Sequence, residues 1–207
     1  MDPLFDLPWL SDQAFREHAR DFLQKYHPTH TIPVPIEEIV EIKLRLNVVP
    51  TPGLHEHFDI DGLLANTLDT IWVDRFFFDK RLARHRFTLA HEVAHLLLHA
   101  DIYRSAPSTI SEWREFIRSI PEATYSRLEY QANCVAGLIL MPSDHLRKET
   151  EASIRLVEGE GINLQEHWDF AWNCIAGHLA ERFFVSSAAA RAALSAQGVE
   201  EAYRNRT

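Results

Sequence analysis

Residues 91–95 read His-Glu-Val-Ala-His, a spacing that can hold a metal ion. Residues four apart lie on one face of an α-helix, so His91 and His95 can direct two imidazole nitrogens at the same ion. Glu92 lies about a quarter-turn round the helix, where its carboxylate can take a proton from a water molecule without occupying a coordination position. A divalent metal lowers the pKa of a water that it holds and so prepares it to attack a carbonyl group. The motif predicts metal-dependent hydrolysis with Glu92 as the general base.

The alternative interpretation of this motif is a charged helix that contains two histidines by chance, because a five-residue pattern is short. The flanking sequence favours the metal. The neighbouring residues have the character of a protein core: Phe87, Leu89, Val93, Leu96 and Leu97. Buried polar side chains need partners, and a shared metal ion would supply one.

A third ligand must come from elsewhere in the chain. One class of zinc peptidase places a histidine ten positions after the first, but that position is Asp101. His99 would have to span a further ~6 Å along the helix axis, so we interpret it as a neighbour of the ligands or a core residue. Glu129, on a second predicted helix, can complete a zinc site of two histidines and one glutamate. Asn133, one turn further on, can accept the distal N–H of a ligating histidine and fix its tautomer.

The donor set of His91, His95 and Glu129 predicts one divalent ion per chain, with Zn²⁺ as the first choice and Mn²⁺ as the alternative. An oxyanion stabiliser is also expected near the metal, and the sequence does not choose among three candidates: Tyr103, Tyr125 and His99. Several other chemically capable or aromatic residues are given structural interpretations. We interpret His55 and His57 as solvated loop residues, Cys134 as a small buried residue, and the cluster of Trp168, Phe170 and Trp172 as core.

Composition narrows the class of protein. The 207 residues are 46% hydrophobic and 25% charged, as in an ordinary globular protein, and the formal net charge of −9 disfavours direct binding of nucleic acid. We find no apolar run of the ~18–20 residues that a membrane-spanning helix needs. The acidic N-terminus lacks the order of a secretory signal, and the two cysteines offer no disulfide framework. The predicted compartment is the cytoplasm, and the protein is predicted to bind no membrane.

The hydrophobic pattern predicts an α+β fold that is mostly helical, with a small sheet of few strands in the first half. Strands are expected over 46–49, 58–64 and 66–73. Helices are expected over 11–26, 35–38, 80–99, 110–120, 121–141, 142–157, 163–184 and 186–198. The motif then lies on the helix 80–99, and Glu129 and Asn133 lie on the helix 121–141.

Three ordered segments resemble the ImmA/IrrE family of metallo-endopeptidases. They are Arg86-Phe87-Thr88-Leu89-Ala90-His91-Glu92-x-x-His95 with Leu96-Leu97-Leu98-His99, then Glu129-x-x-Ala132-Asn133, then Leu138-x-Leu140-Met141-Pro142. The similarity covers roughly residues 32–142 and is weaker beyond them. It implies a gluzincin-like zinc site at His91, His95 and Glu129, with catalysis by Glu92. It also implies a zincin-like metallopeptidase core at 32–150, after an N-terminal helix at 1–31.

The resemblance further implies a substrate class: helix-turn-helix repressors, which such enzymes cut to release genes of mobile elements or stress responses. The segment 151–207 is expected to form a helical, helix-turn-helix-like subdomain. It is acidic, and we therefore expect it to contact protein rather than DNA. Two departures from the family pattern are Ala94, where glycine is common, and the alanine-rich last helix. The alternative function is a metal-stabilised anti-repressor that sequesters its partner without cutting it, and a homo-oligomer is left open.

Overall fold

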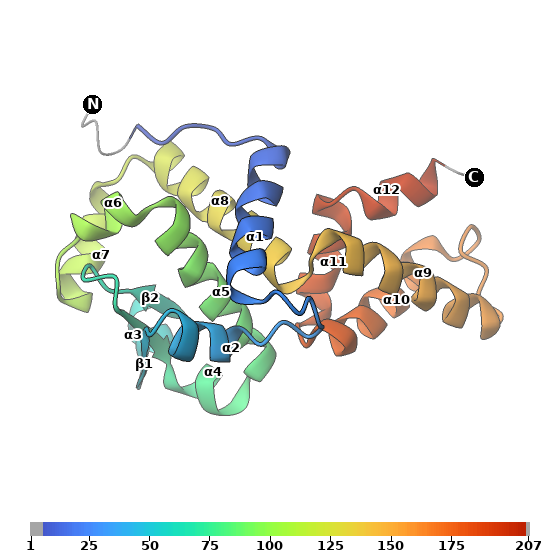
Figure 1. Cartoon of the computed structure of the whole chain (residues 1–207), viewed down its shortest axis with the longest axis horizontal. Helices are drawn as coiled ribbons and strands as arrows, with labels where there is room; N and C mark the ends of the chain where they lie inside the picture. The colour runs from blue at the N-terminus through green and yellow to red at the C-terminus, as the bar shows by residue number, and fades with distance from the viewer. Residues whose placement is uncertain (1–5, 206–207) are drawn as a thin grey trace.

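The computed structural model describes residues 6–205 (Figure 1). The helices of this part of the chain are α1 (Asp12–Tyr26), α2 (Ile36–Glu38), the π-helical turn η2 (Ile39–Lys43), α3 (Leu54–Phe58), α4 (Arg75–Lys80), α5 (Leu82–Leu98), α6 (Ala100–Arg104), α7 (Ile110–Ser119), α8 (Glu122–Leu140), α9 (Ser143–Gly159), α10 (Trp168–Phe183), α11 (Ser187–Ala196) and α12 (Val199–Arg204). The strands are β1 (Asn47–Thr51), β2 (Gly62–Leu64) and β3 (Thr70–Asp74). The predicted α+β fold with few strands and many helices is confirmed.

Side-chain caps set several helix boundaries. The hydroxyl of Ser11 accepts the N–H of Ala14 at 3.2 Å and begins α1 where the sequence predicts it. The Asp74 carboxylate accepts the N–H of Phe76 at 2.9 Å and so begins α4 directly after β3. The helix expected over 80–99 corresponds to α5, which begins at Leu82. The preceding α4 was not predicted from the sequence, and Arg81, whose backbone is not helical (φ −134°, ψ 60°), separates the two helices.

The sheet has β3 in the middle, parallel to β1 and antiparallel to β2. Ile71 and Val73 of β3 are buried, as expected of β-branched side chains in the central strand of a sheet. The strand expected from residue 58 begins only at Gly62, because residues 54–58 form α3 with Leu54 buried beneath it. His55 and His57 consequently lie on a helical turn, and the expectation of a loop there is wrong.

The remaining helices form two groups (Figure 1). In one group α5 packs along α8 beside the sheet, and α1 lies against α8. The other group comprises α9 to α12, with Trp172, Phe183 and Leu194 buried inside it. Phe170 is 61% exposed and does not belong to this core, because its position on α10 faces outward; that part of the expected aromatic core is wrong.

The C-terminal helices are joined by two sharp turns. Phe184 ends α10 in the left-handed conformation (φ 54°), and the hydroxyl of Ser186 then caps α11 by accepting the N–H of Ala189 at 3.1 Å. Gly198 (φ 67°) ends the predicted last helix and allows a further helix, α12, to begin. The predicted domain boundary at residue 150 falls inside α9, and the division into a core and a C-terminal subdomain stays a prediction.

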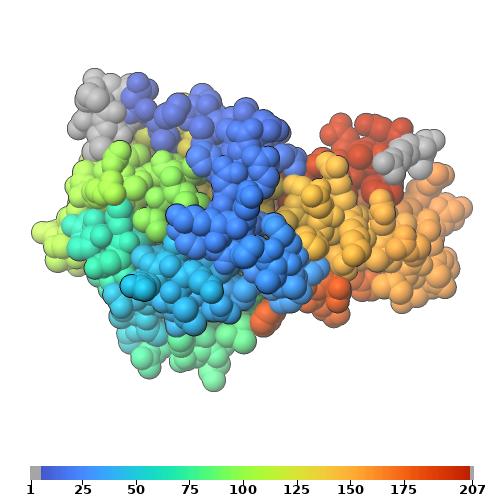
Figure 2. Space-filling view, in the orientation of Figure 1, coloured from blue at the N-terminus to red at the C-terminus, as the bar shows by residue number. Residues whose placement is uncertain are grey.

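Arg86 of α5 joins three parts of the chain. Its buried guanidinium donates to the carbonyl oxygen of Val34 and to the carboxylate of Glu37, each at 2.5 Å, and to the carbonyl oxygen of Phe184 at 3.1 Å. These partners belong to the segment before α2, to α2 itself and to the end of α10. Figure 2 shows N-terminal residues, in blue, between the two groups of helices on this face of the molecule. The side chain thus connects α5, the helix that carries the motif, to the segment that leads into α2 and to the end of α10.

No helix within residues 6–205 is both long enough and apolar enough to cross a membrane.

Candidate metal centre

The packing of α5 against α8 brings His91, His95 and Glu129 together. The two imidazole Nε2 atoms lie 2.9 Å apart. The Glu129 carboxylate lies 3.2 Å from His91 Nε2 and 3.6 Å from His95 Nε2. One potential ligand atom from each residue lies within 4.8 Å of the other two. The helical spacing of the histidines and the choice of Glu129 on a second helix therefore correspond to a real cluster.

The donor set of this cluster fits a divalent cation. Two imidazole nitrogens that face each other at hydrogen-bonding distance, next to a carboxylate, offer lone pairs that one cation can share. Two nitrogens and one carboxylate oxygen are also the ligand types of catalytic zinc sites, which keep a fourth position open. His95 is 1% exposed and Glu129 is 32% exposed, so the cluster is closed beneath His95 and accessible beside Glu129.

Asn133 determines the orientation of His91. Its side-chain Oδ1 lies 3.1 Å from His91 Nδ1, one helical turn from Glu129. An amide oxygen can only accept, so the proton of the imidazole lies on Nδ1 and the Nε2 lone pair faces the cluster. This is the tautomer that a metal ligand needs, and the contact is the one expected of Asn133 from the sequence.

A longer chain of hydrogen bonds fixes the tautomer of His95. Gln131 donates its Nε2–H to the carbonyl oxygen of Pro8 at 2.6 Å, which leaves its Oε1 to accept from His99 Nε2 at 3.0 Å. His99 then has its lone pair on Nδ1, where it accepts from His95 Nδ1 at 3.0 Å. His95 Nε2 is thereby left unprotonated and facing the cluster. His99 contacts a candidate ligand and does not join the donor cluster, as its position on the helix indicates.

Glu92 is buried beside the cluster, on the side of the sheet. Its carboxylate accepts the backbone N–H of Leu64 at 2.8 Å. Burial raises the pKa of Glu92 to about 7, a value suited to a group that must both take and return a proton near neutral pH. The approach of β2 to α5 requires glycine at position 62, since a Cβ there would lie 2.3 Å from Thr88 Cγ2 and 3.5 Å from Glu92 Cγ.

The pKa values of His91 and His95 are shifted in opposite directions. Burial lowers the pKa of His95 well below its ordinary value, with the neighbouring His91 adding to the effect. Burial also acts to lower the pKa of His91, but the carboxylates of Glu129 and Glu92 outweigh it and the net shift is upward. Burial thus favours the neutral form of His95, whereas the two carboxylates favour the protonated form of His91.

A pocket of about 260 Å³ opens beside these residues and is lined by both candidate tyrosines. Tyr103 is buried with its ring 4.9 Å from that of His95, and burial raises its pKa well above the ordinary value. Tyr125 is half-buried near Glu129, and burial raises its pKa to about 12. Both hydroxyls therefore stay protonated and able to donate a hydrogen bond.

The sequence also matches a family model, that of the IrrE N-terminal-like domain of the Peptidase M78 family, over residues 71–195. The match spans more than half of the chain and includes α5 and α8. The chain belongs to this family. The matched region begins later than the resemblance over residues 32–142 and ends at residue 195, so α9, α10 and most of α11 are part of what the M78 family model describes, whereas α12 lies outside it. Among curated proteins, none matches the chain.

Membership of the M78 family gives the site a metallopeptidase-type role, with a protein as the class of substrate. Two contributions to the site were not foreseen from the sequence. The Gln131 amide gives no signal in a single sequence, because its role depends on the packing of Pro8 against α8. The Leu64 N–H is a backbone group whose position follows from the sheet, and no residue type marks it.

Proposed function

We propose that this M78 protein is a zinc-dependent endopeptidase in which His91, His95 and Glu129 hold the metal and Glu92 is the general base. The observation that carries the proposal is the convergence of three donor groups from α5 and α8 on one point, with a buried carboxylate next to them. Zn²⁺ is the first choice for two imidazoles and a carboxylate, and Mn²⁺ stays the alternative.

The residues of the chain divide the chemistry among them. A bound zinc ion supplies a Lewis acid that polarises the scissile carbonyl and lowers the pKa of a water. Glu92 removes the proton of the attacking water and delivers it to the amine that leaves. The Leu64 N–H fixes one carboxylate oxygen of Glu92 at 2.8 Å, so that its other oxygen can face the water. Tyr125, half-buried in the pocket wall, can donate its hydroxyl to the developing oxyanion.

The substrate that we propose is a helix-turn-helix transcriptional repressor, whose cleavage would release genes of mobile elements or of a stress response. The support is the likeness of the three sequence segments to the ImmA/IrrE peptidases, together with membership of the M78 family. Such a substrate would place the protein in the cytoplasm. We further propose that the acidic helices of the C-terminal region contact protein rather than DNA.

The test is to incubate the zinc-loaded chain with the repressor encoded beside it and to weigh the products by mass spectrometry. We expect two fragments that sum to the repressor plus one water. We also expect no cleavage after removal of zinc with a chelator. A stable complex of intact repressor with the zinc-loaded protein would instead support the sequestering anti-repressor and contradict hydrolysis.

A further inference from the structure

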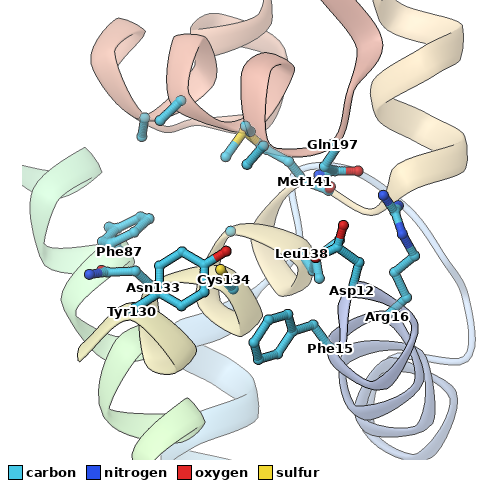
Figure 3. A pocket seen from close by; sticks show the side chains of 15 residues that line it. Asp12, Phe15, Arg16, Phe87, Tyr130, Asn133, Cys134, Leu138, Met141 and Gln197 are labelled. Carbon is cyan, nitrogen blue, oxygen red and sulfur yellow. Dashed lines mark hydrogen bonds between the residues drawn. The ribbon is translucent and has the colours of Figure 1, made fainter. Parts of the chain in front are cut away.

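A second and larger cavity lies between the two groups of helices. It encloses about 490 Å³ and has walls from α1, α8 and α11, with Phe87 of α5 at one side. In Figure 3 Phe87 and Asn133 lie at one end of the cavity, and Asp12 and Arg16 of α1 lie at the other. We call this cavity the α1–α8–α11 groove.

The walls of the groove are mostly apolar, with polar side chains at its two ends and at Gln197. Large apolar or aromatic side chains form its floor and sides: Phe15, Phe87, Tyr130, Leu138 and Met141. Met141 and Phe15 are buried, whereas Tyr130 is half exposed at the edge. Charged groups occur only toward the α1 end, where Arg16 donates to the hydroxyl of Ser143 at 2.7 Å. The groove therefore suits apolar groups rather than ions.

The small side chains of α11 explain why the groove is open. This helix presents four alanines to it, Ala189, Ala192, Ala193 and Ala196, and Gly137 of α8 lies opposite. Leucine or phenylalanine at the same positions would fill the space between α8 and α11, as such residues do elsewhere between the packed helices. The alanine-rich sequence of α11, one of the two departures from the family pattern, thus has a structural consequence.

The groove adjoins the candidate metal centre. Phe87 and Asn133 line both the groove and the smaller pocket around His91, His95 and Glu129. Asn133 contacts His91 at 3.1 Å, so the end of the groove lies within one side chain of a candidate ligand. A polypeptide whose scissile bond lies at the metal centre therefore has the groove within reach, past Phe87 and Asn133.

We propose that the α1–α8–α11 groove is a specificity site that binds large apolar side chains of the polypeptide substrate, on one side of the scissile bond. The inference rests on the proposed peptidase function and adds the chemistry of the substrate to it. Its support is that the groove shares two lining residues with the metal pocket, that its walls are mostly apolar, and that its volume lies in the range of ligand-binding pockets.

Two substitutions on α11 form a matched pair for the test. Ala192→Phe places a ring in the groove at an exposed position, where the change should not disturb the core. Ala188→Phe makes the same change one turn earlier on the same helix, at an exposed position that does not line the groove. Equal midpoint temperatures of thermal unfolding in the two variants would show that α11 is intact in both.

The probe is a degenerate decapeptide library. It is presented to the zinc-loaded full chain carrying Glu92→Gln, which should bind peptides without cutting them. The peptides that this variant retains are sequenced by mass spectrometry. We expect peptides with Leu, Ile, Met or Phe to be enriched. Adding Ala192→Phe should abolish that enrichment and weaken binding of the best peptides at least tenfold, while Ala188→Phe should change neither. An unchanged preference in Ala192→Phe, or no retained peptides at all, would overturn the proposal.

Cleavage of the same library by the unsubstituted chain separates this inference from the proposed function. If Ala192→Phe alters which peptides are retained but no peptide is cut, the groove stands and hydrolysis is contradicted. If the library is cut and the cleaved sequences are the same with Ala192→Phe, hydrolysis stands and the groove is contradicted. A second copy of the chain as the occupant would appear as a dimer that Ala192→Phe dissociates, and that result would also overturn the proposal.

Discussion

Glu92 has a role in this site that a metal ligand would not have. It lies next to His91 in the chain, yet its carboxylate faces β2 and accepts the Leu64 N–H at 2.8 Å, outside the His91–His95–Glu129 cluster. Glu92→Gln should therefore keep the metal and lose hydrolysis, because an amide cannot take a proton from water. The zinc content, determined by elemental mass spectrometry, and the rate of product formation are measured on the same sample. Turnover comparable to that of the unsubstituted chain would remove Glu92 from the mechanism.

Asn133 is expected to act on the metal through His91. Asn133→Ala removes the acceptor of the Nδ1–H and releases the imidazole from its orientation, so zinc affinity should fall ~10–100-fold. Competition with a coloured chelator measures the affinity, and Asn47→Ala, at an exposed position of β1, serves as the control. Unchanged affinity in Asn133→Ala would leave Asn133 with a packing role only.

Single residues differ in how well the sequence reveals them. The four-residue spacing of His91 and His95 fixes a common face on any helix, so their meeting follows from helix geometry alone. Asn133 follows from Glu129 by the same geometry, once both are placed on one helix. Gln131 could not be predicted, because its contact with His99 matters only through the position of Pro8, some 120 residues away in the chain.

At the scale of elements, the site depends on how closely β2 approaches α5. Gly62→Ala would place a methyl group 2.3 Å from Thr88 Cγ2, so β2 must move away from α5, the helix that carries both Thr88 and Glu92. We expect a loss of about 1–3 kcal/mol in the free energy of unfolding and a fall in peptidase activity. Gly177→Ala in α10, where nothing lies within 4 Å of the added Cβ, is the control and should stabilise by about 0.5–1 kcal/mol. Denaturant unfolding measures both, and equal stability of the two variants would contradict the close packing.

The elements were predictable where the local signal is strong. Ser11 caps α1 at the start of the predicted helix 11–26, and Ser186, one of the two serines that could cap the next-to-last helix, caps α11. The helix α8 begins after Pro121 and ends before Met141. The errors occur where a contact from another segment decides the local structure. Residues 54–58 form α3 rather than the start of a strand, with Leu54 buried and the His55 N–H donated to the Asp74 carboxylate at 2.9 Å.

At the scale of the whole molecule, Arg86 holds the N-terminal segment and the end of α10 to the helix of the motif. Its side chain is 4% exposed, and Arg86→Met would remove the ion pair with Glu37 and leave two carbonyl oxygens without this donor. We expect a loss of about 3 kcal/mol in the free energy of unfolding. Arg84→Met removes an ion pair to Asp61 from a side chain that is 50% exposed, and should cost less than about 1 kcal/mol. Thermal unfolding of the two variants distinguishes them, and a smaller loss for Arg86→Met than for Arg84→Met would contradict the joining role.

The fold class of the whole molecule was predictable from the sequence, but the packing of its helices was not. The α+β class follows from strand-like segments before residue 74 and helical periodicity after it. The groove between α1, α8 and α11 could not be foreseen, because it depends on which face of the alanine-rich α11 lies toward α8. Only the packed structure shows that these alanines leave a space next to the metal pocket.

The central claim is that His91, His95 and Glu129 together bind one zinc ion, and a zinc titration of the metal-free chain tests it most directly. We expect about one zinc per chain for the unsubstituted protein and for the control Glu122→Ala, which removes an exposed glutamate on the same helix as Glu129. Glu129→Ala should bind at least about tenfold more weakly. Full zinc occupancy of Glu129→Ala, with the affinity of the unsubstituted chain, would contradict the account.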